Sequence, residues 1–343
     1  MPSAQKSTSG TNERVLVTGG TGVVGRYTVE ALVERGYTVR VLSRNPQNYA
    51  WLKKLNVEVA QGDITDPAAV EAAMAEVTRV VHTAALVSLW PRRMPEMLAI
   101  NLEGTRNVLA ACKKHRVQRM VHIGALASVG EPNDATITKV TEATATHPRA
   151  DESEYTASKR LANAAVEQAA REGLSVVSVL PPLILGTGEW TSSSAAFFKL
   201  MYDGFAFYTD MRLPAVSADD LTHVIVSLLF TNAYSGERFF VTAGALRGRE
   251  MFSLIAQSVG KPAPTIKLPN ALIRSLGWLS EKISFITNRE PLFTVASANA
   301  LIENYPYEYV GEKAERLLNF KYKPLPQAIA ETGPVLLEAH KIA

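Results

Sequence analysis

Residues 15–25, which read Val-Leu-Val-Thr-Gly-Gly-Thr-Gly-Val-Val-Gly, join a short apolar run to a glycine-rich turn. A helical pattern from Arg26 to Arg35 follows directly. This order predicts a strand, a turn and a helix, in which glycines let the backbone approach a phosphate. The free N–H groups at the start of the helix would face its negative charge. The spacing of Gly19, Gly22 and Gly25 differs from the commonest dinucleotide fingerprint, so a tight turn without a ligand stays open as an alternative.

The composition is that of an ordinary globular protein. Hydrophobic residues make up 47% of the 343 residues, charged residues make up 20%, and the net charge is +3. These values argue against disorder, and without a concentrated basic stripe we expect no nucleic-acid partner. Cys112 is the only cysteine, and the six histidines lack ligand spacing. We therefore expect neither an intrachain disulfide nor a metal site.

Three observations on the sequence bear on where the protein is located. Residues 1–12 are rich in Ser, Thr and Gly and are predicted to form a flexible tail. They lack the apolar run of a signal peptide. The sequence contains no uninterrupted stretch of ~18 apolar residues, so we expect no transmembrane helix and a cytoplasmic protein. Residues Ala271–Ile286 carry apolar positions at helical spacing. For this segment we favour a helix packed on a smaller domain over contact with a membrane surface.

From Glu13 onward, short β-branched runs alternate with longer amphipathic patterns. This alternation predicts an α/β protein with a Rossmann-type, doubly wound parallel sheet. The rhythm changes after Pro181-Pro182, where we expect a smaller, mostly helical C-terminal substrate domain. The predicted sheet domain covers 13–182 plus about 217–245, and the substrate domain covers about 183–216 plus 246–343. The expected strands are Arg14–Thr18, Thr38–Ser43, Val57–Gln61, Arg79–Ala84, Arg119–Ile123 and Ser175–Leu180, with Glu237–Thr242 returning to the sheet.

The end of the second predicted strand indicates which dinucleotide is bound. Folds that prefer NAD carry an acid at this position, which holds the ribose 2′-hydroxyl. Here Ser43 occupies the position, and the guanidinium of Arg44 can reach a 2′-phosphate. NADP is therefore favoured over NAD, with an exposed loop cation as the alternative reading of Arg44. Asp63 is expected to accept from the adenine amino group, and Asp66 to cap a helix. The predicted cofactor-binding residues are Gly19, Thr21, Gly22, Val23, Val24, Gly25, Ser43, Arg44, Asp63, Ile64, Thr83, Ala84, Ala85, Tyr155, Lys159, Pro181 and Leu183.

Tyr155 and Lys159 carry the strongest catalytic signal. Their i, i+4 spacing places them on one face of a predicted helix, Tyr155–Glu172. An ammonium group lowers the pKa of a neighbouring phenol, so the tyrosine can exchange a proton with a substrate oxygen near neutral pH. The lysine can also donate to ribose hydroxyls. An ordinary amphipathic helix is the alternative.

Together these motifs resemble the extended short-chain dehydrogenase/reductases of the NAD-dependent epimerase/dehydratase superfamily. Within it the chain is most similar to the dihydroflavonol-reductase and 3β-hydroxysteroid-dehydrogenase-like branch, over roughly residues 13–245. The resemblance implies bound NAD(P), a Ser/Thr–Tyr–Lys catalytic set, and a homodimer formed by the long helices Met94–His115 and Tyr155–Glu172. It rests on residues 18–25, Gly62-Asp63, residues 82–85, residues 101–105, Tyr155 with Lys159, and Pro181-Pro182.

The sequence departs from the family pattern at three places. The hydroxyl pair expected after the fifth strand falls on Gly124-Ala125, which has no hydroxyl. Losing one donor to a developing oxyanion costs about 10²–10³ in rate. Ser128 is the nearest substitute, ahead of Thr83 and Ser88. The other departures are Asn163, where the family carries Glu, and Leu180, where it often carries Arg.

These observations predict an NADP(H)-dependent oxidoreductase that interconverts a ketone and a secondary alcohol on a fairly apolar small molecule. The aromatic residues expected either to line its pocket or to form a domain interface are Trp90, Phe197, Phe198, Phe205 and Tyr208. One alternative is a nucleotide-sugar epimerase or dehydratase, for which Arg92, Arg93, Arg212, Arg247 and Arg249 could hold a diphosphate. The other is a catalytically impaired NADP-binding regulator, motivated by Ala125.

Overall fold

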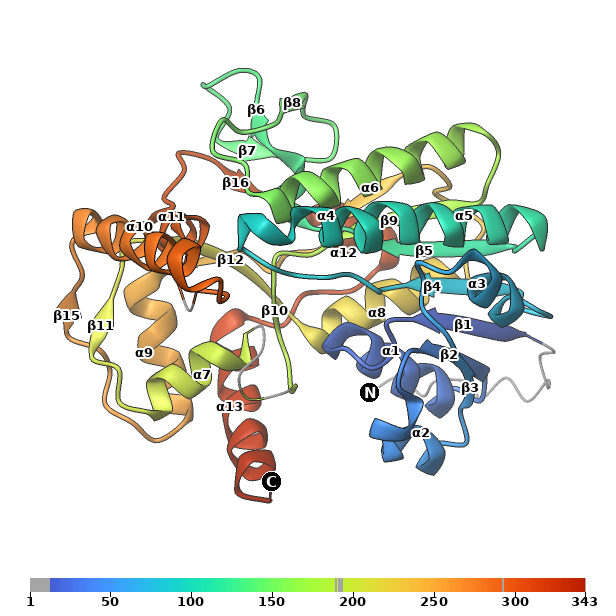
Figure 1. Ribbon diagram of the computed structural model, residues 1–343, viewed down its shortest axis with the longest axis horizontal. Coiled ribbons are helices and arrows are strands. Elements are labelled where there is room, and N and C mark those ends of the chain that lie inside the picture. Colours follow the sequence, from blue (N-terminus) through green and yellow to red (C-terminus); the bar gives the residue numbers. More distant parts are fainter. Residues whose placement is uncertain (1–12, 189, 191–193, 292, 343) are drawn as a thin grey trace.

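A seven-stranded parallel sheet forms the centre of the protein (Figure 1). The computed structural model describes residues 13–342 except 189, 191–193 and 292. The strand order is β13-β9-β5-β4-β1-β2-β3, and every neighbouring pair is parallel. The six predicted strands are confirmed, and the predicted return strand pairs with β9. The bounds are β1 (Arg14–Thr18), β2 (Thr38–Ser43), β3 (Glu58–Gln61), β4 (Arg79–His82), β5 (Arg119–Ile123), β9 (Val176–Leu180) and β13 (Arg238–Phe240).

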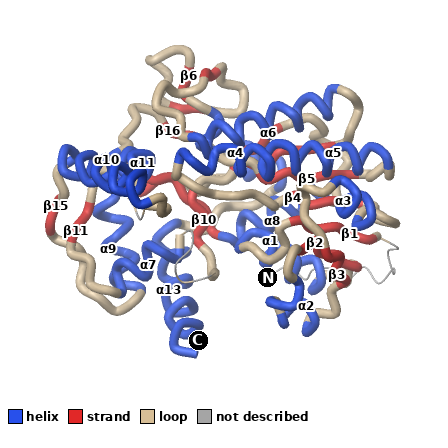
Figure 2. The backbone as a smooth tube through the Cα atoms, in the orientation of Figure 1, coloured by secondary structure: helices blue, strands red, loops and turns tan. Residues whose placement is uncertain are grey.

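Helices cover both faces of this sheet (Figures 1 and 2). Side chains alternate between the faces along a strand, so Val15 and Val17 of β1 pack with α1 and α8, whereas Leu16 packs with α3 and α5. The predicted fold class is confirmed. The helices are α1 (Val23–Glu34), α2 (Ala50–Lys54), α3 (Pro67–Ala73), α4 (Met94–Met97), α5 (Gly104–Lys114), α6 (Glu154–Arg171) and α8 (Ala218–Leu229).

Two local features stand out in this half of the chain. Asp66 caps α3 as predicted, because its carboxylate accepts the N–H of Ala68 at 2.9 Å and Pro67 opens the helix. The long helix expected over Met94–His115 is not regular. A π-helix, Leu98–Glu103, lies between α4 and α5, and such insertions are frequent at functional sites.

A second apolar cluster lies beyond β9, at the left of Figure 1. Met251 and Phe252 of α9 pack there with Phe198 of α7 and Ile329 of α13. The sequence did not predict the three-stranded sheet that joins this cluster to the main sheet, β10 (Leu183–Leu185), β12 (Arg212–Ser217) and β14 (Ala245–Arg247). The remaining elements are α7 (Ala195–Tyr202), β11 (Phe207–Tyr208), α9 (Gly248–Ser258), β15 (Ile266–Lys267), α10 (Asn270–Thr287), α11 (Val295–Ile302) and α13 (Leu325–Ile342).

The segment after α11 returns to the first half of the chain. β16 (Glu308–Tyr309) pairs with β7 (Lys139–Val140), and Ala314 of α12 (Glu312–Leu318) packs in the same cluster as β1. Nearby, β6 (Glu131–Pro132) pairs with β8 (Thr146–His147). Residues 308–322, which the sequence placed with the substrate domain, thus contact elements of the first half of the chain. The predicted tail, residues 1–12, lies outside the described residues.

Candidate active site

A cavity of about 1140 Å³ opens at the carboxyl ends of the strands, where ligands bind in open α/β sheets. The helix start after the glycine turn lines it on one side, and residues 303–312 line it on the other. The structure thus brings into one cavity residues that are far apart in the sequence. Of the predicted site residues, those lining it are Gly19, Gly22, Val23, Val24, Gly25, Thr83, Ala85, Tyr155, Lys159, Pro181 and Leu183.

At Gly19 and Gly25 the glycine turn leaves no room for a side chain. Gly19 has a φ of +69°, and a Cβ there would lie 2.5 Å from the backbone N of Ala84. A Cβ on Gly25 would lie 2.1 Å from the carbonyl O of Gly19. Gly22, the N-cap of α1, provides no capping side chain, so the first N–H groups of this helix face the cavity without a side-chain acceptor. This cradle fits the pyrophosphate of a dinucleotide.

Other predicted cofactor residues lie outside the cavity wall. Arg44 is largely exposed at the end of β2, and its Nε is 3.9 Å from the Asp63 carboxylate. Asp63 already accepts from the N–H and the hydroxyl of Thr65, each at 2.9 Å. Ser43 and Ile64 are buried. Thr21 and Ala84 lie beside residues of the cavity wall but do not line the cavity themselves. The structure therefore places none of these six predicted residues in the wall of the cofactor cavity.

Tyr155 and Lys159 face the cavity from the first turns of α6. The Nζ of Lys159 donates to the carbonyl O of Ile123 at 2.8 Å, and burial lowers the pKa of this lysine to about 8. The expectation that the ammonium lowers the pKa of Tyr155 is wrong for this arrangement. Although the ring is partly exposed to the cavity, the dense protein around it desolvates the phenolate and raises the pKa of Tyr155 to about 12.

The π-helix positions the loop beside these residues. It carries Asn101, whose amide Oδ1 accepts the N–H of Leu86 at 2.7 Å. The Nδ2 of Asn101 donates to the carbonyl O of Leu86 and to the hydroxyl of Ser158. Ser158 in turn donates to the carbonyl O of Tyr155. Asn101 therefore joins the loop after β4 to the helix that carries Tyr155 and Lys159.

Two buried histidines lie beneath the lysine. His82 Nε2 is 2.9 Å from the hydroxyl of Thr105, which donates its proton to Asn101 O. Nε2 must therefore carry the hydrogen, and Nδ1 accepts from Thr18 at 2.6 Å. Burial and the charge of Lys159 lower the pKa of His82 to about 3, and the same causes lower the pKa of His122. Both rings are neutral, so Lys159 is the cation of this cluster.

The three departures from the family pattern meet in one place. A Cβ on Gly124 would lie 2.2 Å from Cδ2 of Leu180 and 2.6 Å from Oδ1 of Asn163. The Nδ2 of Asn163 donates to Ser128, and Ser128 donates to the carbonyl O of Ala125 at 2.6 Å. The single proton of Ser128 is thus engaged, and its side chain does not line the cavity. This geometry argues against Ser128 as a replacement for the missing hydroxyl.

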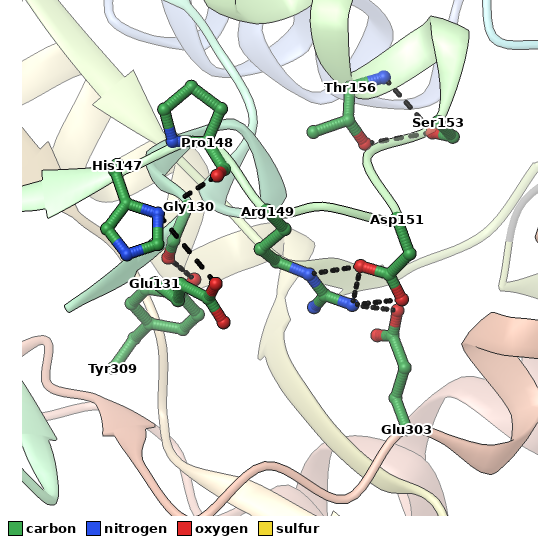
Figure 3. A network of polar contacts seen from close by, with 10 residues as sticks. All are labelled: Gly130, Glu131, His147, Pro148, Arg149, Asp151, Ser153, Thr156, Glu303 and Tyr309. Carbon is green, nitrogen blue, oxygen red and sulfur yellow. Dashed lines mark hydrogen bonds and ion pairs between the residues drawn. The ribbon is translucent and has the colours of Figure 1, made fainter. Parts of the chain in front are cut away.

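The far wall of the cavity has a polar network that the sequence did not indicate (Figure 3). Arg149 donates to the Asp151 carboxylate at 2.8 Å and to Glu303 at 3.1 Å, and its guanidinium lies 3.8 Å from the ring centroid of Tyr305. Burial raises the pKa of Glu303. Tyr309 donates to the carbonyl O of Gly130 at 2.6 Å, which holds β16 against the sheet domain. Only pairing across more than 150 residues assembles this wall.

The cavity is not lined by the aromatic residues that the sequence suggested. Phe198 is fully buried, and Phe197 packs on Phe252 with ring centroids 5.7 Å apart. Phe205 and Tyr208 also pack around the second cluster, and Trp90 lies outside the cavity wall. Most of these aromatic residues are therefore described better by the alternative that they form apolar core at a domain interface than by a pocket lining. The aromatic side chains that do line the cavity are Tyr155, Tyr305, Tyr307, Tyr309 and Tyr322.

The fold and the site together define a dinucleotide-binding enzyme: a glycine cradle at a helix start shares one cavity with a tyrosine and a lysine on a neighbouring helix. No group of three His, Cys, Asp or Glu side chains in the described part of the chain is placed to hold a metal ion.

The chain belongs to the NAD-dependent epimerase/dehydratase family, whose family model matches residues 15–206. It is 30% identical to sterol demethylase protein B of Methylococcus capsulatus, over 83% of this chain and 87% of that protein. It is 26% identical to a putative dihydroflavonol 4-reductase of Synechocystis, over 92% of each. The crystal structure of gox2253 has the same fold, with a TM-score of 0.79 at 24% identity, covering 96% of this chain and 98% of that one. The protein is an NAD(P)-dependent oxidoreductase of the extended short-chain dehydrogenase/reductase type.

Proposed function

We propose that this enzyme uses NADP(H) to interconvert a ketone and a secondary alcohol on a fairly apolar small molecule. The observation that carries the proposal is the shared cavity, into which the glycine cradle, Tyr155 and Lys159 all open. Apolar side chains, among them Val87, Leu126 and Leu213, line much of the remaining wall. The similarity to a protein named for sterol demethylation supports a large apolar substrate.

NADPH bound at this site would supply the hydride that reduces the carbonyl carbon of the substrate. Tyr155 donates its phenolic proton to the carbonyl oxygen, so that hydride and proton together convert the ketone to the alcohol. The ammonium of Lys159 would hold ribose hydroxyls of the cofactor. Burial raises the pKa of Tyr155 to about 12, so the phenol keeps its proton at neutral pH and can act as the general acid. Solvent then returns a proton to Tyr155.

Arg44 is proposed to select NADP over NAD. Replacing it in Arg44→Ser should weaken NADP binding about ten- to hundredfold, because a charge-assisted hydrogen bond to a phosphate contributes about 1.5–3 kcal/mol. The exposed guanidinium is free to reach past Asp63, 3.9 Å away. Titration of the nucleotides against protein fluorescence measures the effect, with NAD as the internal control. An equal loss for NAD and NADP would contradict this role.

A nucleotide-sugar epimerase or dehydratase is the second candidate, since family members include such enzymes. Of the five arginines suggested for a diphosphate, only Arg212 lines the cavity, where it pairs with Glu308. Arg92 instead donates to Asn288, and Arg93 pairs with Glu96. This distribution favours the reductase. Cofactor that stays bound through dialysis, together with no ketone-dependent loss of NADPH absorbance, would favour the epimerase instead.

A cofactor-binding regulator that has lost turnover is the third candidate. Ala125 lines the cavity in an extended conformation, with φ −147° and ψ 135°, which serine adopts equally well. We expect Ala125→Ser to leave ketone reduction unchanged or to raise it, by up to about 10²-fold, because the added hydroxyl can donate to the developing oxyanion. Steady-state rates at saturating NADPH test this. A loss above about tenfold would mean that another native group already occupies that space.

The division into a sheet domain and a substrate domain is proposed with the amendment that residues 308–322 belong to the sheet domain. The homodimer expected from the long helices also stays a proposal, as does a cytoplasmic location. None of the helices described for this chain is long and apolar enough to cross a membrane.

A further inference from the structure

Helix α10, Asn270–Thr287, exposes an apolar stripe to solvent at the left end of the molecule in Figure 1. Ile286 is 86% exposed, and the other members of the stripe are about half exposed. Their spacing of four, three, four and three residues places them in a single line along the helix. The α10 stripe consists of Leu272, Leu276, Leu279, Ile283 and Ile286.

Another side of the helix, about 100° around from the stripe, already has its partner. Ile273, Gly277 and Ser284 are buried, and a Cβ on Gly277 would lie 2.9 Å from Cβ of Ala298 in α11. The sequence-based expectation that this helix packs on the smaller domain is thus met by one face only. The stripe lies on a different face, next to two further exposed aromatic side chains, Trp278 and Phe285.

The charges on and beside α10 are mainly basic. Arg274, Lys282 and Arg289 are exposed. The one acid of the helix, Glu281, is half buried and accepts the N–H of Val295 at 2.8 Å. Lys282 lies 5.6 Å from the ring centroid of Trp278, which is 58% exposed. An apolar line beside a tryptophan and several cations is typical of helices that lie in a bilayer interface.

We propose that the α10 stripe docks on the surface of a bilayer that contains anionic lipid. Negatively charged headgroups complement the exposed cations, which would repel each other if two copies of this face met. The C-terminal end of α10 is also tied to the cavity rim, since Glu290 accepts from Ser88 at 3.1 Å and Asn288 accepts from Arg92. Val87, beside Ser88, lines the cavity and is largely exposed. Docking would therefore bring the cavity mouth towards the lipid.

Co-sedimentation of the full chain with phosphatidylcholine vesicles, made with and without phosphatidylserine, tests the proposal. We expect binding to the vesicles that contain phosphatidylserine, and a blue shift of Trp278 fluorescence that is absent in Trp278→Phe. The double variant Leu279→Ser/Ile283→Ser should reduce binding about tenfold or more, because two exposed aliphatic side chains no longer enter the interface. Val335→Ser, which changes an equally exposed residue on α13, serves as the matched control and should bind like the wild type.

A second variant, Lys282→Gln/Arg289→Gln, keeps the test decisive if the double serine variant does not fold. It should weaken binding to phosphatidylserine vesicles and abolish much of its salt dependence. Failure of the wild type to sediment with these vesicles would overturn the proposal. So would a dimer in light scattering that the serine variant dissociates, because a second copy would then cover the stripe. Turnover of a water-soluble ketone without vesicles tests the proposed function separately.

Discussion

Tyr155→Phe should lower the rate of ketone reduction by about 10²–10⁴-fold, the usual contribution of one general acid. The substitution removes the hydroxyl that is proposed to donate the proton and keeps the ring that faces the cavity. The affinity for NADPH should not change, since the glycine cradle and Lys159 remain. Loss of NADPH absorbance on addition of a panel of ketones measures turnover, and quenching of protein fluorescence measures binding.

Tyr37→Phe is the matched control for this substitution. Tyr37 stacks on Phe230 with ring centroids 4.1 Å apart and does not line the cavity, so turnover should stay at the wild-type level. Unchanged turnover in Tyr155→Phe would remove this residue as the general acid and, with it, the proposed dehydrogenase mechanism.

Gly25→Ala should damage both stability and cofactor binding. The added Cβ would lie 2.1 Å from the carbonyl O of Gly19 and 2.6 Å from Cα of Gly20. Both contacts are with backbone, which cannot rotate away, so the turn and the start of α1 must shift. Overpacking of this kind costs about 1–3 kcal/mol, which corresponds to a fall in Tm of about 1–4 °C for a chain of this size.

Gly22→Ala is the control for the glycine turn. A Cβ there would meet only the carbonyl O of Gly19, at 3.5 Å, an ordinary contact. Its Tm should therefore stay close to that of the wild type, whereas Gly25→Ala melts earlier and loses NADPH affinity. Thermal denaturation and nucleotide titration of the two variants side by side give the comparison. Equal Tm values for both would show that the turn tolerates a side chain at residue 25.

The strands of the sheet follow closely from local sequence. Observed β1, β2 and β5 have the predicted bounds, because short runs rich in β-branched and other apolar residues are typical of strands buried in a parallel sheet. The π-helix at Leu98–Glu103 was not predictable in this way, since six residues of altered helical spacing between two α-helical segments carry too little pattern to be recognised. The strands of the small sheet, such as β10 and β14, are only three residues long and carry too little pattern to be recognised.

Part of the candidate site was predictable for a related reason. Gly19–Gly25 is a continuous local motif, and Tyr155 and Lys159 are one helical turn apart, so backbone geometry alone brings each group together. The direction of the Tyr155 pKa was predicted wrongly, because it depends on how densely other segments surround the ring. The exposure of the α10 stripe, likewise, depends on where α11 happens to pack.

The sheet, the glycine cradle and the Tyr155/Lys159 pair are encoded locally, since each depends on residues that are neighbours along the chain. The side chains that face the cavity are set instead by tertiary packing. In the folded protein, Gly124 packs against Asn163 and Leu180. The hydroxyl of Ser128 donates its proton to the carbonyl O of Ala125. Tertiary packing also closes the cavity with Arg149 and Glu303, which are 154 residues apart and meet because β16 pairs with β7. Packing between distant segments sets these contacts, and no local pattern of residues encodes them.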